Sequence, residues 1–369
     1  MQKIKVLSVF GTRPEAIKMA PLIKILESHP KITSVVCVTA QHRTMLDGVL
    51  NAFGITPQYD LNIMEKEQTI ADITSKALCG IDRVIKQEQP SIVLVHGDTT
   101  TALAASLAAF YNRVSIGHVE AGLRCDNKYS PFPEEMNRRM IDSLSDLFFA
   151  PTEVSRSNLK KQNVPDEMIF VTGNTSIDAM KSTLKEDYRH EVLDWVGESR
   201  LLLLTAHRRE NLGEPMKCIF RGIRRALEET ENVKAVYPMH LNPEVRKVAF
   251  DVFDGCANVR LIEPLEVSDF HNFQSRAHLI LTDSGGIQEE ACALGKPVLV
   301  LRSTTERPEG VSAGTLRLAG TGEDSVYRET LRLLTDPAEY AKMSRIANPY
   351  GDGHAGERIA SAIIKHFAV

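Results

Sequence analysis

Short apolar segments alternate with longer amphipathic ones along most of the chain. The apolar segments of the first half are rich in valine and isoleucine and lack regular polar alternation: KVLSVF, SVVCVTA, SIVLVHG, VSIGHVE and LFFAP. Such continuous runs are typical of strands in a parallel sheet that is covered on both faces. Helical patterns lie between them, for example over residues 14–27 and 70–89. This βαβ repetition predicts an open, doubly wound α/β sheet.

The pattern is interrupted once and then starts again. Residues 175–198 are charged and contain no strand-like run. Beyond them LLLLTA, VKAVYP, VRLIEP, LILTD and PVLVL again alternate with helical patterns. A chain of 369 residues is also long enough for two cores. We therefore predict two Rossmann-like domains, residues 1–175 and 176–352, and a closing helix over 353–369 that packs back toward the first domain.

Composition and charge narrow the class of protein. The chain is 43% hydrophobic and 25% charged, as in folded globular proteins. Its net charge of −4 gives no basic excess for nucleic acid or an anionic membrane, so neither partner is expected. Six scattered cysteines without a C-x-x-C pair favour free thiols in a reducing compartment over a zinc site or disulfides. The first apolar run is too short for a signal peptide or a membrane span. We expect a cytoplasmic protein.

The loops that follow the predicted strands are the first place to look for chemistry, because ligands of open α/β sheets bind beyond the carboxyl ends of strands. The first strand is followed by GTRPE, where Arg13 and Lys18 lie near a helix start. They could hold an anion there, or they could be solvated residues of an ordinary turn. HGDTTT places Asp98 after the fourth strand, either as a helix N-cap or as a site residue.

Two acids bracket the loop after the fifth strand. In HVEAGLRCDNKYSPFPEEMNRRM, Glu120 ends the strand and Glu134 begins the next helix. Glu120 could simply pair with Arg124. Glu134 could complement the helix dipole or pair with Arg138 one turn on. Each acid alone is therefore weak evidence for a catalytic site.

The second half repeats the plan of the first strand end. LLLLTAHRRE resembles VLSVFGTRPE, since both consist of a buried strand, a tight loop with an arginine followed by an acid, and a helix. His207 heads the second loop and Arg208 follows it. A lone histidine is more often structural than catalytic, but its place at a strand end favours a functional role.

A glycine-rich turn follows a later strand of the second half. In TDSGGIQEE, the Ser284–Gly285–Gly286 run would let a helix N-terminus approach a phosphate. Glu290 lies one turn inside that helix, where it would repel phosphate and better suits a pair of ribose hydroxyls. Arg307 in TTERPEG could contact a diphosphate. The turn matches neither the Walker A loop nor G-x-G-x-x-G. Phosphate-binding groups and carboxylates together indicate a nucleotide-sugar enzyme.

These motifs also resemble a known family. GTRPEAIKMAP, TAQHR, HGDTTT, HVEAGLR, PFPEEMNRR, TAHRREN and TDSGGIQEEACALGKPVLVLR with TTERPE are similar to the non-hydrolysing UDP-N-acetylglucosamine 2-epimerases, in order over nearly the whole chain. The resemblance implies a GT-B-like fold of two Rossmann-like domains facing a cleft, usually as a homodimer. It implies interconversion of UDP-GlcNAc and UDP-ManNAc without NAD, another cofactor or a metal, which would supply ManNAc for cell-surface polysaccharide.

The resemblance also assigns roles to individual residues. It implies four catalytic residues: Asp98, Glu120, Glu134 and His207. It implies a larger set that binds the substrate: Arg13, Lys18, Phe270, Ser284, Gly285, Gly286, Glu290 and Arg307. It implies a possible allosteric site for a second UDP-GlcNAc: Gln41, His42 and Arg208.

The chain departs from the family pattern at three positions. Leu265 stands where many relatives have a glutamine, so it cannot offer a side-chain amide to uracil. Thr44 and Glu67 stand where relatives with an allosteric site have Gln and Arg. Two other functions share this architecture: a hydrolysing epimerase, which releases free ManNAc, and a retaining GT-B glycosyltransferase, which would need an acceptor groove. A third alternative, a non-catalytic UDP-sugar sensor, fits poorly with the three acids.

Overall fold

The chain forms two α/β units. The computed structural model describes residues 3–40, 43–65, 67–125, 127–129 and 131–368. Unit 1 comprises Met1–Ser182 together with Gly351–Val369, and unit 2 comprises Thr183–Tyr350. The sequence placed these borders after residues 175 and 352.

Unit 1 is built on a parallel sheet whose strand order is β3-β2-β1-β4-β5-β6-β7. The seven strands of its described residues are β1 (Ile4–Phe10), β2 (Ile32–Val38), β3 (Tyr59–Asp60), β4 (Ile92–His96), β5 (Ser115–Val119), β6 (Leu147–Ala150) and β7 (Ile169–Val171). The order reverses between β1 and β4, which are direct neighbours. This is the switch point at which doubly wound sheets bind their ligands.

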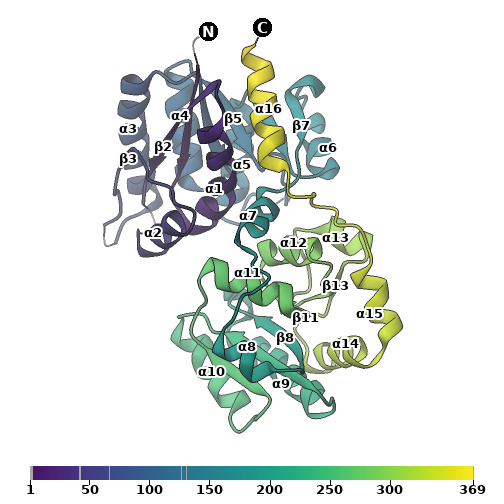
Figure 1. Cartoon of the computed structure of the whole chain (residues 1–369). Helices are drawn as coiled ribbons and strands as arrows, with labels where there is room; N and C mark the ends of the chain where they lie inside the picture. Colours follow the sequence, from purple (N-terminus) through teal and green to yellow (C-terminus); the bar gives the residue numbers. More distant parts are fainter. Residues whose placement is uncertain (1–2, 41–42, 66, 126, 130, 369) are drawn as a thin grey trace. The chain divides into compact units, whose positions relative to one another are not determined.

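Helices cover both faces of this sheet (Figure 1). They are α1 (Arg13–Ser28), α2 (Arg43–Ala52), α3 (Ile70–Glu88), α4 (Thr100–Tyr111), α5 (Glu134–Leu144), α6 (Glu153–Lys161), the 3₁₀ turn η1 (Asp166–Met168), α7 (Thr175–Thr183) and α16 (Ala355–Phe367). Along β1, Val6 and Phe10 join the core on one face, and Leu7 and Val9 join the core on the other. Burial on both faces explains why the strand is apolar without alternation.

The C-terminal helix α16 belongs to unit 1 and packs against α1 (Figure 1). A Cβ on Gly356 would lie 2.7 Å from Ile25 Cδ1, so the two helices approach closely. The carboxylate of Asp178 in α7 accepts hydrogen bonds from the backbone N–H groups of Ala355 (3.2 Å) and Gly356 (2.8 Å). These contacts join α7 to unit 1, beyond the border that the sequence suggested.

Unit 2 has a parallel sheet of the order β10-β9-β8-β11-β12-β13. Its six described strands are β8 (Arg200–Thr205), β9 (Val233–Pro238), β10 (Val259–Ile262), β11 (Ala277–Thr282), β12 (Val298–Val300) and β13 (Leu316–Leu318). The order reverses between β8 and β11, which pair directly. Unit 2 therefore has the same switch-point arrangement as unit 1.

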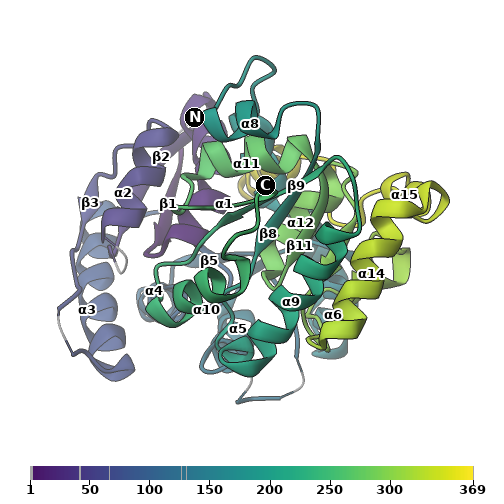
Figure 2. The ribbon, with the colours of Figure 1, turned by 90° about the horizontal axis from the view of Figure 1, so that it is seen from below.

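The helices of unit 2 again lie on both faces of the sheet. They are α8 (Glu191–Val196), the 3₁₀ turn η2 (Arg209–Asn211), α9 (Glu214–Glu228), α10 (Pro243–Phe253), α11 (Val267–Arg276), α12 (Gly285–Ala293), α13 (Pro308–Ala313), α14 (Glu323–Thr335) and α15 (Pro337–Ser344). Figure 2 shows α9 and α14 side by side. A Cβ on Gly222 of α9 would lie 2.5 Å from the carbonyl oxygen of Glu323, so the glycine permits this close packing.

The predicted class, two Rossmann-like doubly wound parallel sheets, is confirmed. Cys37 and Cys292 are buried free thiols. Within the described ranges, no helix combines the length and the apolar character that crossing a membrane would require.

Candidate functional site

Most of the residues predicted to carry chemistry lie at the two switch points. In unit 1 the described ones follow β1, β4 and β5, and in unit 2 most follow β8 and β11, whereas Arg307 follows β12 and Phe270 follows β10. Because all these strands are parallel, their carboxyl ends share one edge of each sheet.

A buried carboxylate fixes the loop between β1 and α1. Glu15, only 2% exposed, accepts hydrogen bonds from the N–H groups of Gly11 (3.1 Å) and Thr12 (2.8 Å) and from the Thr12 hydroxyl (2.7 Å). Its other oxygen accepts from the Thr99 hydroxyl (2.8 Å) after β4. Burial raises the pKa of Glu15, and these hydrogen bonds oppose the shift. The bonds tie together the two loops that flank the switch point.

Glu120 is the centre of a polar cluster at the end of β5. Its backbone has a φ of +67°, a left-handed conformation that is costly for a residue with a Cβ and is common at active sites. Its Oε2 atom forms an ion pair with Lys18 Nζ, accepts from Asn174 Nδ2 (2.9 Å) and lies 3.9 Å from His96 Nε2. Burial lowers the pKa of His96 to about 3, so this ring is neutral at physiological pH.

The pairing of Glu120 with Arg124, left open by the sequence, is wrong. Arg124 Nη2 donates to Asp142 Oδ2 (2.6 Å) and to Gln162 Oε1 (2.6 Å). Asp142 also binds His118 Nδ1 (2.6 Å), and these bonds lower its pKa against the effect of burial. Arg124 is therefore part of a buried support beneath the loop, and the contacts described for Glu120 are with Lys18 and Asn174.

Asp98 lies in the same electrostatic environment as the other two acids. Burial raises the pKa of Asp98; the Arg138 guanidinium, 2.8 Å away, opposes this, while the charges of Glu120 and Glu134 add to it. The alternative role of Asp98 as a helix N-cap is wrong, because Thr99 caps α4 with its own side chain. The structure thus brings Glu120 and Glu134 within electrostatic reach of Asp98.

Glu134 begins α5, as the sequence predicted. The neighbouring acid Glu135 is fully buried and pairs with Arg139 (2.7 Å) and, at 3.7 Å, with Arg138. Glu135 therefore forms the ion pair with Arg138 that the sequence analysis considered as a structural role for Glu134.

Three other sequence predictions have a simpler outcome. Arg13 is the first residue of α1, as expected for a residue near the helix start. Gln41 and His42, the predicted allosteric pair, lie outside the described residues. Arg208, the third member of that group, lies in unit 2 beside Asp283.

In unit 2, Asp283 holds the loop that follows β8. Its side chain is fully buried, and its Oδ2 atom accepts from the N–H groups of His207 (2.9 Å) and Arg208 (2.8 Å) and from Asn211 Nδ2 (3.1 Å). Its Oδ1 atom has no hydrogen-bond partner among the described residues and lies 3.6 Å from His207 Nδ1. The carboxylate therefore joins the ends of β8 and β11.

The ring of His207 stacks on a second histidine. His240, which follows β9, lies with its ring centroid 5.4 Å from that of His207 at an interplanar angle of 15°. The His207 side chain remains 38% exposed. Partial burial lowers its pKa, Asp283 opposes this shift, and the positive charges of His240 and Arg208 add to it. His207 thus combines an accessible ring with a carboxylate neighbour.

The glycine-rich turn opens α12 as predicted. Ser284 is the N-cap residue, and a Cβ on Gly285 would lie 3.8 Å from Arg307 Nη2. A Cβ on Gly286 would meet no atom within 4 Å. The fold therefore does not require a glycine at 286, and its small size leaves room for a ligand to approach the helix N-terminus. Arg307, beside this turn, forms an ion pair with Glu289.

Glu290, one turn further along α12, is held by residues of α11. Its Oε2 atom accepts from Gln274 Nε2 (3.1 Å) and lies 3.8 Å from His271 Nε2. Phe270 is a partly buried residue of the same helix α11, and Leu265 lies just before it.

Sequence reasoning missed several polar residues that the structure adds to these two groups: His96, Arg138, Asn174, His240 and Asp283. His96, Asp283 and His240 follow recognised strands or end them, so the strand-end rule could have found them. Asn174 follows β7, which was not recognised as a strand. Arg138 was considered only as a partner for nearby acids in the helix.

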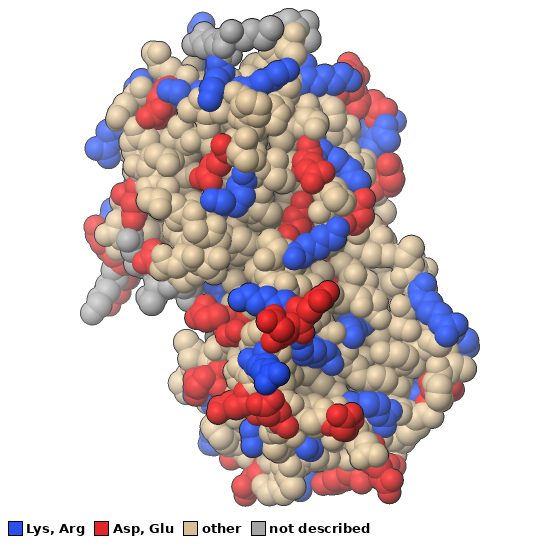
Figure 3. Space-filling view, in the orientation of Figure 1, with Lys and Arg blue, Asp and Glu red and all other residues tan. Residues whose placement is uncertain are grey.

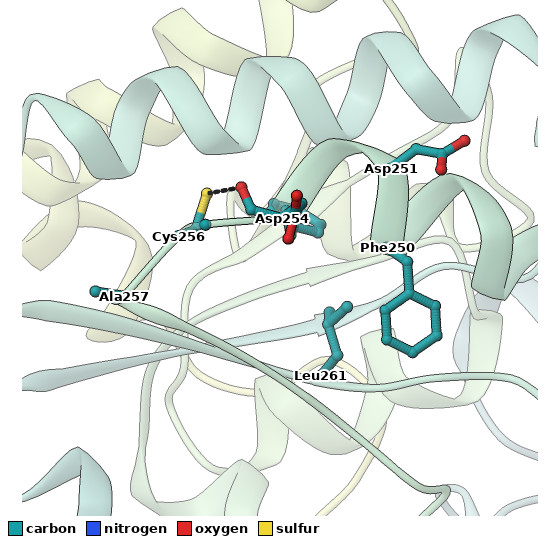
Figure 4. A pocket seen from close by; sticks show the side chains of 8 residues that line it. Phe250, Asp251, Asp254, Cys256, Ala257 and Leu261 are labelled. Carbon is teal, nitrogen blue, oxygen red and sulfur yellow. Dashed lines mark hydrogen bonds between the residues drawn. The ribbon is translucent and has the colours of Figure 1, made fainter.

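Unit 2 also has a surface hollow of about 990 Å³ (Figure 4). It is lined by Phe250, Asp251, Asp254, Cys256 and Leu261, among others, and none of its lining residues is basic. The loop from α10 to β10 leads into the amino end of a strand, so the hollow lies away from the ligand-binding edge. It does not suit a phosphorylated ligand.

Charged residues of both signs alternate on the face of each unit that Figure 3 shows. Among the residues that the structure describes, no three His, Cys, Asp or Glu side chains form a group suited to a metal ion. The predicted absence of nucleic-acid partners and of a cofactor stays a prediction.

Comparisons with known proteins agree on one family. A family model for UDP-N-acetylglucosamine 2-epimerase matches residues 24–364. The chain is 61% identical to the UDP-N-acetylglucosamine 2-epimerase of Bacillus subtilis (strain 168), over 100% of this chain and 97% of that protein. It is similar to the UDP-GlcNAc 2-epimerase of Neisseria meningitidis solved with UDP-GlcNAc, at 49% identity and a TM-score of 0.90, covering 98% of this chain and 100% of that one. It is also similar to S. aureus MnaA solved with UDP, at 53% identity and a TM-score of 0.92, covering 99% and 97%. The expected GT-B-like class is confirmed, and the chain belongs to the UDP-N-acetylglucosamine 2-epimerase family of isomerases.

Proposed function

We propose that this chain interconverts UDP-GlcNAc and UDP-ManNAc by anti-elimination of UDP, which gives 2-acetamidoglucal, followed by re-addition. The observation that carries the proposal is the group of Asp98, Glu120 and Glu134 in the loops after the strands of unit 1, in which the charges of Glu120 and Glu134 act on Asp98. Family membership supplies the substrate class.

The chemistry explains why carboxylates are needed. The proton on C2 of a pyranose is not adjacent to a carbonyl group, so a carboxylate cannot remove it directly near pH 7. Departure of UDP from C1 gives that carbon oxocarbenium character and makes the C2 proton acidic. One acid then removes the proton, and another returns it to the opposite face. General acid–base catalysis of this kind contributes about 10²–10⁴-fold per step.

The acids of unit 1 have different neighbours, which suits two different roles. Lys18 beside Glu120 favours the ionised carboxylate, which is the form of a base. Burial raises the pKa of Asp98, which favours the protonated form of an acid. Environments that separate the proton affinities of two carboxyl groups are the usual basis for acid and base assignments.

The residues of unit 2 suit the departing UDP. The open space at Gly286 and the N-terminus of α12 favour a phosphate group. Arg307 lies at the same turn, and His207 and Arg208 follow the neighbouring strand β8. Positive groups aimed at the charge that develops on the leaving group are a large source of catalysis. Glu290 would bind the ribose hydroxyls, and Phe270 would flank uracil.

The first experiment is incubation of the pure protein with UDP-GlcNAc alone in D₂O, followed by NMR of the sugar. UDP-ManNAc with deuterium at C2 and no net free sugar is the expected result. Free ManNAc with UDP would instead indicate the hydrolysing epimerase. Unchanged substrate would refute the proposed reaction under these conditions, and turnover only with an added acceptor would indicate the glycosyltransferase.

The amide variants Asp98→Asn, Glu120→Gln and Glu134→Gln test the acids one at a time. Each should lower turnover by about 10²-fold or more and leave UDP binding, measured by calorimetry, largely unchanged. Near-normal turnover in one variant would remove that residue from the mechanism.

Three properties remain proposals that rest on the family resemblance and on the sequence. The protein would act as a homodimer in the cytoplasm, and its product would supply ManNAc for cell-surface polysaccharide. Light scattering of the purified protein tests the first of these.

A further inference from the structure

Asp283 is a buried carboxylate next to His207, the histidine that we place at the departing diphosphate. Asp283 has one oxygen engaged with three N–H donors of the loop after β8, and its second oxygen has no hydrogen-bond partner among the described residues. A buried acceptor without a partner normally costs stability, so it calls for a functional explanation. His207 Nδ1 lies 3.6 Å from this second oxygen.

We propose that Asp283 is a positioning residue, which accepts a hydrogen bond from His207 Nδ1–H, leaves Nε2 for the diphosphate and favours the protonated ring. This inference rests on the proposed function only for the identity of the ligand. The distance of 3.6 Å is longer than a hydrogen bond, but such distances in ligand-free enzymes often shorten when substrate binds. The backbone bonds to Asp283 Oδ2 already hold the loop of His207 in place for this contact.

The proton transfer balances without another reactant. When the C1–O bond breaks, its electron pair stays on the phosphate oxygen, and the Nε2–H proton of the imidazolium moves to a diphosphate oxygen. The ring becomes neutral with its proton on Nδ1, still facing an ionised Asp283. Re-addition of UDP reverses each step. Asp283 itself never takes the proton, as in other carboxylate–histidine pairs.

The charged groups around His207 come from three elements. Asp283 follows β11, His240 follows β9 and stacks on the ring, and Arg208 follows His207 on its own loop. Asp283 favours the imidazolium, whereas His240 and Arg208 oppose it. Because these charges oppose one another, replacing Asp283 and replacing His240 should shift the pKa of His207 in opposite directions.

The variant Asp283→Asn distinguishes the positioning of the His207 ring from the support of the loop after β8. The amide oxygen can still accept the three N–H donors in place of Oδ2, but the amide nitrogen would face His207 Nδ1 and cannot accept its proton. Asn211→Ala is the matched control, because it removes one donor to Oδ2 and leaves Oδ1 unchanged. His240→Phe keeps a stacked ring and removes its charge.

The test is histidine-labelled NMR of the protein saturated with UDP, with the His207 signal assigned by its loss in His207→Asn. In the wild-type protein the neutral ring should carry its proton on Nδ1. The pKa of His207 should fall in Asp283→Asn, rise in His240→Phe and stay unchanged in Asn211→Ala. A neutral ring with its proton on Nε2, or the same pKa in Asp283→Asn as in wild type, would overturn the proposal.

Turnover supplies the second readout. Asp283→Asn should lose about 10²-fold in kcat near pH 7, with the loss becoming smaller as the pH falls and the ring protonates. A kcat that falls equally at every pH would point to a structural defect and would overturn the positioning role. The NMR titration needs no turnover, so a wild-type protein without epimerase activity would refute the proposed reaction while the titration still decides the Asp283–His207 pair.

Discussion

The contact between Asn174 and Glu120 offers a sharp test of the acid cluster in unit 1. Asn174 is buried at the end of β7, donates from Nδ2 to Glu120 Oε2 (2.9 Å) and accepts from the N–H of Ser176 (3.0 Å) at the start of α7. Asn174→Asp keeps the size of the side chain and the helix cap, because Asp and Asn cap equally well. It replaces the donor facing Glu120 with a carboxylate.

The magnitude follows from the geometry. Two carboxylates whose nearest oxygens are in contact have charge centres about 4 Å apart and repel by about 4 kcal/mol at an effective dielectric constant of 20. Lys18, paired with the same oxygen of Glu120, offsets part of this repulsion. The two carboxyl groups, at positions 174 and 120, can relieve the remaining repulsion by keeping one proton between them. The folded variant then holds a proton that the unfolded chain releases. Such a group stabilises the fold at low pH and loses that contribution as the pH rises.

The assay is urea unfolding of wild type and variant between about pH 5 and about pH 8. The loss in the free energy of unfolding caused by Asn174→Asp should grow with pH, by at most about 1.4 kcal/mol per pH unit. Asn174→Ser is the control, since it keeps a capping oxygen without charge and should show a deficit that does not depend on pH. A pH-independent deficit in Asn174→Asp would refute the contact between residue 174 and Glu120.

Two glycines and one histidine give the remaining predictions. A Cβ on Gly11 would collide with Thr39 Oγ1 and lie 2.7 Å from Thr101 Oγ1, so Gly11→Ala should cost about 1–3 kcal/mol in urea unfolding. Gly286→Ala meets open space at a helix start and should leave stability unchanged or raise it by up to about 1 kcal/mol, yet weaken UDP binding in calorimetry; unchanged affinity would argue against phosphate at α12. The pKa of His96 is lowered to about 3, so its contribution to stability is complete above about pH 6.5 and is lost as the pH falls, at about 1.4 kcal/mol per unit. His96→Asn should flatten this part of the stability profile, and an unchanged slope would contradict the burial of a neutral ring.

The fold was largely predictable because its central strands are buried on both faces. Runs such as Ile92–His96 are too short for a typical helix and favour a covered parallel strand. The strands β3, β7 and β13 contain only two or three residues and were missed, whereas β12, equally short, was found within the apolar run PVLVL. A run of that length has no measurable period, and its pairing depends on the neighbouring strand rather than on its own sequence.

The candidate site was predictable only in part, because it also depends on residues that are distant in the sequence. The strand-end rule and the family resemblance together point to Asp98, Glu120 and His207, whose catalytic roles stay a prediction. The partners of these residues depend on contacts between distant parts of the chain. Glu120 has Arg124 four positions away in sequence, yet its described partners are Lys18 and Asn174, which lie 102 and 54 positions away. Sequence proximity therefore misled the assignment of this charge pair.

The charges of the two units support the division of roles that we propose. In unit 1, the acids Asp98, Glu120 and Glu134 are offset by two nearby cations, Lys18 and Arg138, while His96 is neutral. If all three acids were ionised, this group would keep an excess of negative charge and would repel a diphosphate, whereas a neutral sugar ring would suffer no such penalty. In unit 2, the residues beside the α12 N-terminus and after β8 include arginines and a histidine that can be protonated. The bond that breaks joins the sugar to the diphosphate, so the reaction needs groups that handle protons as well as groups that handle phosphate.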